Sequence, residues 1–218
     1  MATKKKFNAS DWISAYMDYV LKNDQSPSSV YAFTSSVKRD ESEFYEEFAS
    51  FKALEAEVFR SLFHASMNTL NSSKEFESFD ARNQLLSFYF TFFENLTANR
   101  SFILFLLKGQ KEQLQIVNNL SGLRKEFKSF IRSLEIEDID IPQEQIEKFK
   151  NKSIEETAWI QLLVTMKFWM DDTSKGFEKT DIFIEKAINT SFDLINVKPL
   201  KSLIDLGKFI VKEKIHWN

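Results

Sequence analysis

Cysteine is absent from this 218-residue chain, and only four glycines and three prolines are present. Without cysteine there can be no disulfide, no thiolate zinc site and no thiol nucleophile. Sheet proteins need many tight turns, which use glycine and proline, so the scarcity of both favours long helices. The two histidines, His64 and His216, lie far apart in the sequence and lack the spacing of metal ligands.

The sequence also lacks the motifs of several enzyme classes. It has no glycine-rich phosphate loop and no nucleophile elbow, so we expect no enzymatic activity, no catalytic residues, no cofactor and no metal site. The longest apolar run, residues 102–107, is far too short to span a bilayer. The N-terminal lysines have no apolar stretch behind them, as a signal peptide would require, and we therefore expect a cytoplasmic protein.

The feature that dominates the chain is a helical spacing of apolar residues along its length, with hydrophobic residues making up 43% of the total. The pattern predicts an all-α protein. The expected helices cover residues 11–22, 27–37, 41–48, 51–70, 81–98, 102–108, 114–134, 154–170, 181–197 and 200–215, and a segment that begins in residues 143–150 leads into the helix at 154–170. The expected N-caps are Ser10, Ser50, Asp80 and Thr180.

One local pattern is more specific than the helical period. Phe48 and Leu54 stand three and nine residues after Tyr45, at the end of the third expected helix and just beyond it. Val30 and Phe33 fall on apolar positions of the second expected helix. Over residues 13–58 the chain resembles the head of TetR-family regulators, with Phe51 replacing the usual lysine, Lys52 following it, and Lys38 where a turn glycine is usual. The resemblance implies a three-helix helix-turn-helix head over residues 1–50. It also implies a larger helical body over residues 51–218 that binds a ligand and dimerises.

The resemblance also implies that the head contacts DNA, with its third helix in the major groove. The candidate DNA-binding residues are Lys4, Lys5, Lys6, Lys38, Arg39, Ser42, Tyr45 and Lys52. The N-terminal lysines either lie in a groove or form a solvated tail. Tyr45 either reaches a phosphate or is a core aromatic residue, whereas Phe48 is expected in the core.

The charge of the third helix opposes this function. Residues 40–47 contain five acidic and no basic side chains, whereas DNA affinity comes largely from cations that neutralise phosphates. Two functions therefore stay open. The first is a ligand-responsive transcriptional regulator that binds DNA as a homodimer. The second is a TetR-fold protein that has lost DNA binding and instead binds a lipid, an apolar small molecule or a partner protein, including at a membrane surface.

The most apolar stretch, residues 85–107, is the expected ligand site, because the resemblance implies an apolar cavity in the body. The candidate ligand-binding residues are Phe88, Phe92, Glu94, Asn95, Asn99 and Arg100. The alternatives are a close-packed core for the aromatic side chains, and a helix cap with a surface ion pair for Glu94 and Arg100.

The later helices carry the expected contacts with other surfaces. The helices at residues 154–170 and 180–197 hold more apolar side chains than one face needs, so they form either a dimer surface or intramolecular core. Residues 200–217 form a basic amphipathic segment that ends near a tryptophan. That segment either lies on an anionic membrane or docks on the body.

Overall fold

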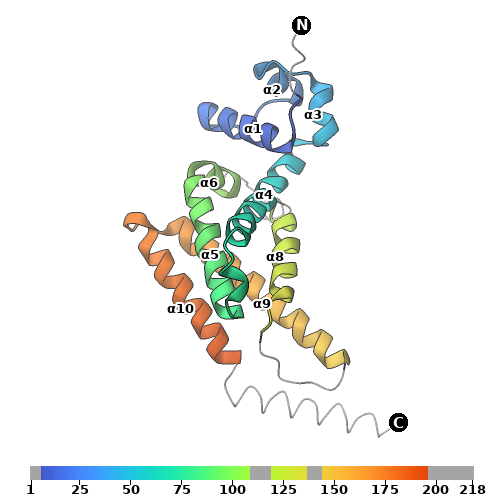
Figure 1. The fold of residues 1–218 in the computed structure, drawn as a ribbon. Helices are drawn as coiled ribbons and strands as arrows, with labels where there is room; N and C mark the ends of the chain where they lie inside the picture. Colours follow the sequence, from blue (N-terminus) through green and yellow to red (C-terminus); the bar gives the residue numbers. More distant parts are fainter. Residues whose placement is uncertain (1–5, 109–118, 137–143, 196–218) are drawn as a thin grey trace, which may run out of the picture. The chain divides into compact units, whose positions relative to one another are not determined.

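The computed structural model describes residues 6–108, 119–136 and 144–195 (Figure 1). Within these ranges the chain forms helices and no strand, which confirms the all-α prediction. The first helices are α1 (Ala9–Asn23), α2 (Val30–Ser36), α3 (Glu41–Glu47) and α4 (Phe51–Asn71). The later ones are η1 (Phe76–Ser78), α5 (Ala81–Ala98), α6 (Arg100–Lys108), α8 (Ser121–Ser133), α9 (Glu144–Asp171), η2 (Lys175–Phe177) and α10 (Glu178–Ile195).

The chain divides into two compact units. The first comprises Met1–Ser66 and Phe92–Glu126, and the second comprises Met67–Thr91 and Phe127–Asn218. Among the described helices, none has the length and hydropathy needed to cross a bilayer. The expected boundary between head and body near residue 50 stays a prediction, although α4 begins at the next residue.

The head, formed by α1, α2 and α3, is built around aromatic rings. Trp12 of α1, Phe33 of α2 and Phe44 of α3 are fully buried, and the ring of Trp12 lies 5.9 Å from Phe33 and 5.4 Å from Phe44. Tyr16, one helical turn after Trp12, stacks on Phe51 at 5.2 Å. Edge-to-face and offset ring pairs add to the stabilisation from burial, so a small head obtains a dense core from few residues.

A tight turn separates α2 from α3. Lys38 has φ of 53°, and the backbone N–H of Arg39 donates to the carbonyl of Thr34 at 2.9 Å. This left-handed backbone is the conformation that glycine adopts most easily, which explains why the family usually has glycine at the position of Lys38. Residues 27–48 are therefore a helix, a turn and a second helix, as the resemblance implies.

The N-caps of the helices follow the predictions in part. Ser50 Oγ accepts from Ala53 N at 3.2 Å and Asp80 Oδ1 accepts from Asn83 N at 2.8 Å, as expected. The prediction for α1 was wrong, because Asn8 rather than Ser10 is its N-cap. Asn8 Oδ1 accepts from Asp11 N at 2.9 Å and Asp11 Oδ2 accepts from Asn8 N at 3.0 Å, a reciprocal pair that satisfies two free donors.

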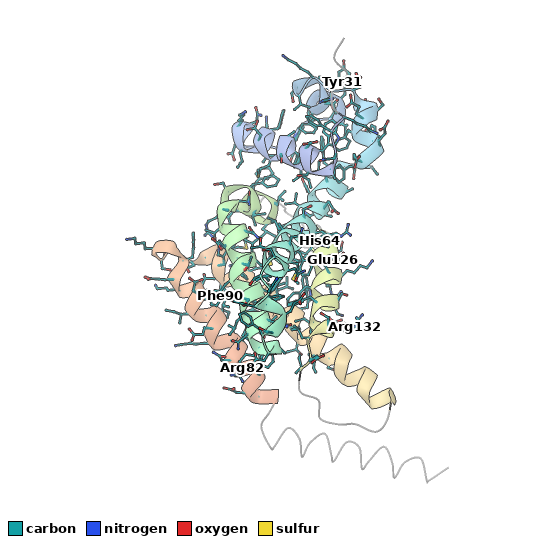
Figure 2. All side chains as sticks on the ribbon, viewed as in Figure 1. Tyr31, His64, Arg82, Phe90, Glu126 and Arg132 are labelled. Atoms are coloured by element: carbon teal, nitrogen blue, oxygen red, sulfur yellow. The ribbon has the colours of Figure 1, made fainter. Side chains whose placement is uncertain are left out.

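Within the first unit, charged side chains join α4 to α8. Arg60 Nε donates to Glu126 Oε1 at 3.0 Å, and His64 Nε2 lies 3.7 Å from the same oxygen (Figure 2). All of these side chains are at least partly exposed to water, so the attraction between them is screened. These contacts orient the two helices more than they stabilise them.

Within the second unit, aromatic rings again fill the core. Phe88 of α5 is fully buried and lies 5.5 Å from Phe127 and 5.1 Å from Phe130, both of α8. Tyr89 is also buried, and burial raises the pKa of its hydroxyl well above the usual value. Arg132 of α8 donates from two nitrogens to the Glu155 carboxylate of α9, each at 2.9 Å, which fixes these helices side by side.

One helix start in the second unit differs from prediction. α9 begins at Glu144, in agreement with the segment predicted to begin in residues 143–150 and to continue into residues 154–170. α10 begins at Glu178, so Thr180 is not its N-cap. Instead the Asp172 carboxylate accepts from Thr180 N at 2.9 Å and from Thr180 Oγ1 at 2.7 Å. An aspartate eight residues upstream thus provides the acceptor for the first turn of α10.

Candidate functional site

The surface of α3 carries two of the candidate DNA-binding residues. Ser42 is exposed, and Tyr45 is 52% exposed, so Tyr45 is a surface residue rather than part of the core. The core positions of α3 and its end are held by Phe44 and Phe48, whose rings lie 5.9 Å apart. Sequence analysis had missed Phe44. Figure 2 shows a second exposed aromatic side chain of the head, Tyr31, at the outer side of α2.

The tyrosine hydroxyl on α3 already has a partner. Tyr45 Oη donates to Glu41 Oε1, one turn earlier, at 3.3 Å. Partial desolvation and the nearby charge of Glu41 raise the pKa of Tyr45. The hydroxyl that is expected to meet a phosphate therefore donates to a carboxylate of its own helix.

Arg39 is held inside the head surface rather than extended into water. Only 12% of its side chain is exposed, and Nη1 lies 3.3 Å from Oε2 of Glu43. The guanidinium also lies over the Phe7 ring, 4.1 Å from the centroid. The charged pair and the ring contact together fix the direction of this side chain.

The lysine candidates differ in their surroundings. Lys6 forms an ion pair with Glu46 of α3. The hydrogen bond between the two side chains raises the pKa of Lys6. Lys38 and Lys52 are exposed. The remaining two, Lys4 and Lys5, lie outside the described residues.

The candidate ligand-binding residues fall mainly on one face of α5 and its end. Phe88, Phe92, Asn95 and Asn99 follow one another at spacings of four, three and four residues, so they form a single stripe. Phe88 belongs to the second unit, whereas the other candidates belong to the first. Both phenylalanines are fully buried.

Polar groups continue this stripe beyond the aromatic rings. Asn95 Nδ2 donates to Oγ of the buried Ser66 of α4 at 2.8 Å, and Asn99 Nδ2 donates to the carbonyl of Asn95 at 2.9 Å. Glu94 is exposed and Arg100 is half-buried. The structure thus brings the two asparagines together, while Glu94 lies on the opposite, solvent-facing side of α5.

A buried polar network in the first unit escaped sequence analysis. The Tyr16 hydroxyl donates to Glu55 Oε1 at 2.6 Å, and Asn119 Nδ2 donates to Glu55 Oε2 at 3.4 Å. All three side chains are at most 6% exposed, and burial raises the pKa of Tyr16. The network joins α1 of the head to α4. Its one sequence signal was an acidic residue inside the apolar stripe of α4, next to Leu54 and before Val58.

The helices expected to form a dimer surface leave apolar side chains exposed. Ile160, Val164 and Phe168 follow at four-residue spacing on α9 and are 58%, 51% and 37% exposed. On α10, Ile182 and Leu194 are at least half exposed. Three other large side chains of α9 are buried and therefore belong to the intramolecular core: Trp159, Met166 and Trp169. α9 therefore packs one side into its own unit and presents another apolar side to the surroundings.

These features define a class: an all-helical protein whose second and third helices are joined by a tight turn. The family model described as "Tetracyclin repressor-like, C-terminal domain" matches residues 84–210, more than half of the chain. The chain therefore belongs to the tetracyclin repressor-like, or TetR, family. The match and the resemblance at residues 13–58 do not overlap, so they support the family independently. No curated protein matches this chain.

Proposed function

We propose that this protein is a transcriptional regulator that binds DNA as a homodimer and responds to an apolar small molecule bound in its body. The observation that carries the proposal is the α2–turn–α3 geometry, with Ser42 and Tyr45 exposed on α3, in a chain of the TetR family. A helix-turn-helix contacts DNA through the second of its two helices. Exposed side chains on α3 are therefore the ones that meet base edges and phosphates.

The exposed apolar side of α9 and α10 supports the dimer. Side chains of this size rarely stand in a row on a monomer surface, and interfaces are enriched in such residues. Two-fold symmetric heads match two half-sites on DNA, so dimerisation is part of the DNA-binding function.

The buried stripe of α5 supports the ligand proposal. Phe92 offers apolar surface, and Asn95 and Asn99, which belong to the same unit, offer polar groups one and two turns further on. Ligand sites commonly combine a largely apolar lining with a few polar groups that orient the ligand. A flat or aliphatic molecule with one polar end fits this combination.

The test is binding to the DNA upstream of the protein's own gene, measured by fluorescence anisotropy at low salt against a scrambled duplex. We expect preferential binding that weakens steeply with salt. Tyr45→Phe, which keeps the ring and removes the hydroxyl, is expected to weaken binding several-fold, and Tyr31→Phe is its matched control on α2. Equal binding to both duplexes by the wild-type protein would exclude specific regulation by this head.

A second function is favoured by one observation, the acidic charge of the head. Residues 1–50 contain six basic and eight acidic side chains, and four glutamates lie on α3. A TetR-fold protein that has lost DNA binding and binds an apolar molecule or a protein partner would carry such a head. Failure to bind any duplex at low salt, together with saturable binding of 1-anilinonaphthalene-8-sulfonate that Phe92→Asp abolishes, would favour this alternative.

A further inference from the structure

Three of the candidate DNA-binding side chains share one property in the structure. Lys6 pairs with Glu46, Arg39 pairs with Glu43, and the Tyr45 hydroxyl donates to Glu41. Each acceptor is a glutamate of α3. These three groups are therefore bound to carboxylates of the same helix that is expected to enter the groove.

The chain that precedes α1 is anchored on this surface. The Phe7 ring lies 4.1 Å from the Arg39 guanidinium and 5.0 Å, edge to face, from the fully buried Trp12. This anchoring places the neighbouring Lys6 against Glu46. Residues 6 and 7 thus lie as a strap from the head core to α3, rather than as a solvated tail.

We propose that this strap is autoinhibitory: Glu46 and Glu43 of α3 take the place of DNA phosphates on Lys6 and Arg39, so these two cations do not reach the phosphates while the pairs hold. The inference rests on the proposed DNA-binding function and describes its regulation. A carboxylate presents oxygens to a guanidinium or ammonium in the same way as a phosphate does. The two anions therefore compete for the same donors.

The two pairs differ in how readily they exchange. Lys6 and Glu46 are both more than half exposed, so water and salt screen their attraction, and theirs is the weaker of the two pairs. Arg39 and Glu43 are 12% and 25% exposed, and the Phe7 ring covers the guanidinium. The Arg39 pair is therefore the stronger barrier, and its opening requires the strap to move.

The experiment compares the wild-type protein with Glu43→Gln/Glu46→Gln on a scrambled duplex and on the upstream duplex, across a salt series. Glutamine keeps the size of each side chain and removes the charge that competes with phosphate. We expect roughly tenfold tighter binding of both duplexes at low salt. The slope of log K against log salt should become steeper by about two, since two more cations reach phosphates and each contributes roughly 0.9.

Asp18→Asn is the control for overall charge. It removes one acidic charge from the head, as Glu46→Gln alone does, whereas the double variant removes two. It releases Lys22 from an exposed ion pair on α1 that the proposal does not use. Its salt slope should equal that of the wild-type protein. Adding Lys6→Gln to the double variant should reverse about half of the change in slope, because it removes one of the two released cations.

The outcomes separate the inference from the proposed function. An unchanged slope in the double variant, or the same gain in Asp18→Asn, overturns autoinhibition even when the wild-type protein binds its upstream DNA specifically. A steeper slope on the scrambled duplex without any preference for the upstream duplex supports autoinhibition and overturns specific regulation. Circular dichroism checks the folding of each variant. Should the Glu43 change unfold the head, Glu46→Gln alone must still steepen the slope by about one.

Discussion

The head and the α9–α10 pair differ in the kind of side chain that they expose. In the head, Trp12, Phe33 and Phe44 are fully buried, and charged groups at the surface pair with one another. On α9 and α10, apolar side chains remain outside, with Val164 half exposed at the middle of its row. The head buries its core rings within a single chain. The exposed apolar residues of α9 and α10 are instead typical of a surface that a partner covers.

The largest effect is expected in the head core. Trp12→Ala removes the ring that contacts Phe7, Phe33 and Phe44, so a cavity forms that three other rings cannot fill. The expected loss of stability is about 3–5 kcal/mol, measured by urea unfolding. The control is Tyr31→Ala, which shortens a 68% exposed ring and should cost less than about 0.5 kcal/mol. Similar losses in both variants would mean that the head lacks the described core.

Substitutions in the exposed apolar row of α9 should change the assembly of the protein rather than its folding. Ile160→Asp/Val164→Asp places two like charges in the exposed row of α9, so a two-fold contact there would bring four carboxylates together. We expect the dimer to dissociate, with the dissociation constant rising at least about 100-fold, or about 2.7 kcal/mol. Sedimentation equilibrium measures it, and Ser129→Asp on the exposed side of α8 is the control. A dimer that survives the double change uses another surface.

A smaller effect is expected where the head meets α4. Tyr16→Phe removes the donor that lies 2.6 Å from the buried Glu55 carboxylate and leaves the ring contacts in place. The expected cost is about 1–3 kcal/mol in the free energy of unfolding, because the carboxylate oxygen loses a hydrogen bond away from water. Tyr19→Phe removes a hydroxyl from a half-buried ring of the same helix and serves as the control. Equal stability of the two variants would remove the network as a link between α1 and α4.

The smallest effect should depend on pH. Burial alone would raise the pKa of Asp172, but hydrogen bonds from Ser174 and Thr180 lower it well below the usual 3.8. Because the folded-state pKa is lowered, the stabilisation is complete above about pH 4 and is lost as the pH falls further. Asp172→Asn should therefore cost about 1 kcal/mol at neutral pH. The difference in the free energy of unfolding between the variant and the wild-type protein, measured with urea, should be smaller at about pH 3. An equal difference at both pH values would mean that the charge of Asp172 does not cause the loss.

Sequence patterns predicted the helices of the head well and the buried polar contacts poorly. The spacing of Tyr45, Phe48 and Leu54 placed α3 to within one residue, because apolar periodicity and local caps act over a single turn. The cap at Asn8 was missed because several polar residues nearby are equally able to cap. The bond between Tyr16 and Glu55 joins positions 39 residues apart, and no local pattern specifies such a pair.

For the candidate functional residues too, the sequence indicated local patterns but not the contacts between helices. Sequence analysis proposed Phe88, Phe92, Asn95 and Asn99 as ligand-binding residues from the apolar composition of this stretch, and their ligand role stays a prediction. It could not tell that Glu94 faces water or that Asn95 binds Ser66, because those properties depend on which side of α5 meets another helix. The charge conflict on α3 was visible in the sequence, but the assignment of its glutamates to Lys6, Arg39 and Tyr45 was not.

The order of residues alone determined that this protein is helical, that a short helix follows a turn in its head, and that its third helix is acidic. Those properties depend on neighbours within one or two helical turns. Only the tertiary structure decided which rings are buried, which apolar row on α9 stays exposed, and which cations Glu43 and Glu46 hold. Burial and charge pairing are properties of side chains that meet across helices, and their energies depend on the water that the packing excludes.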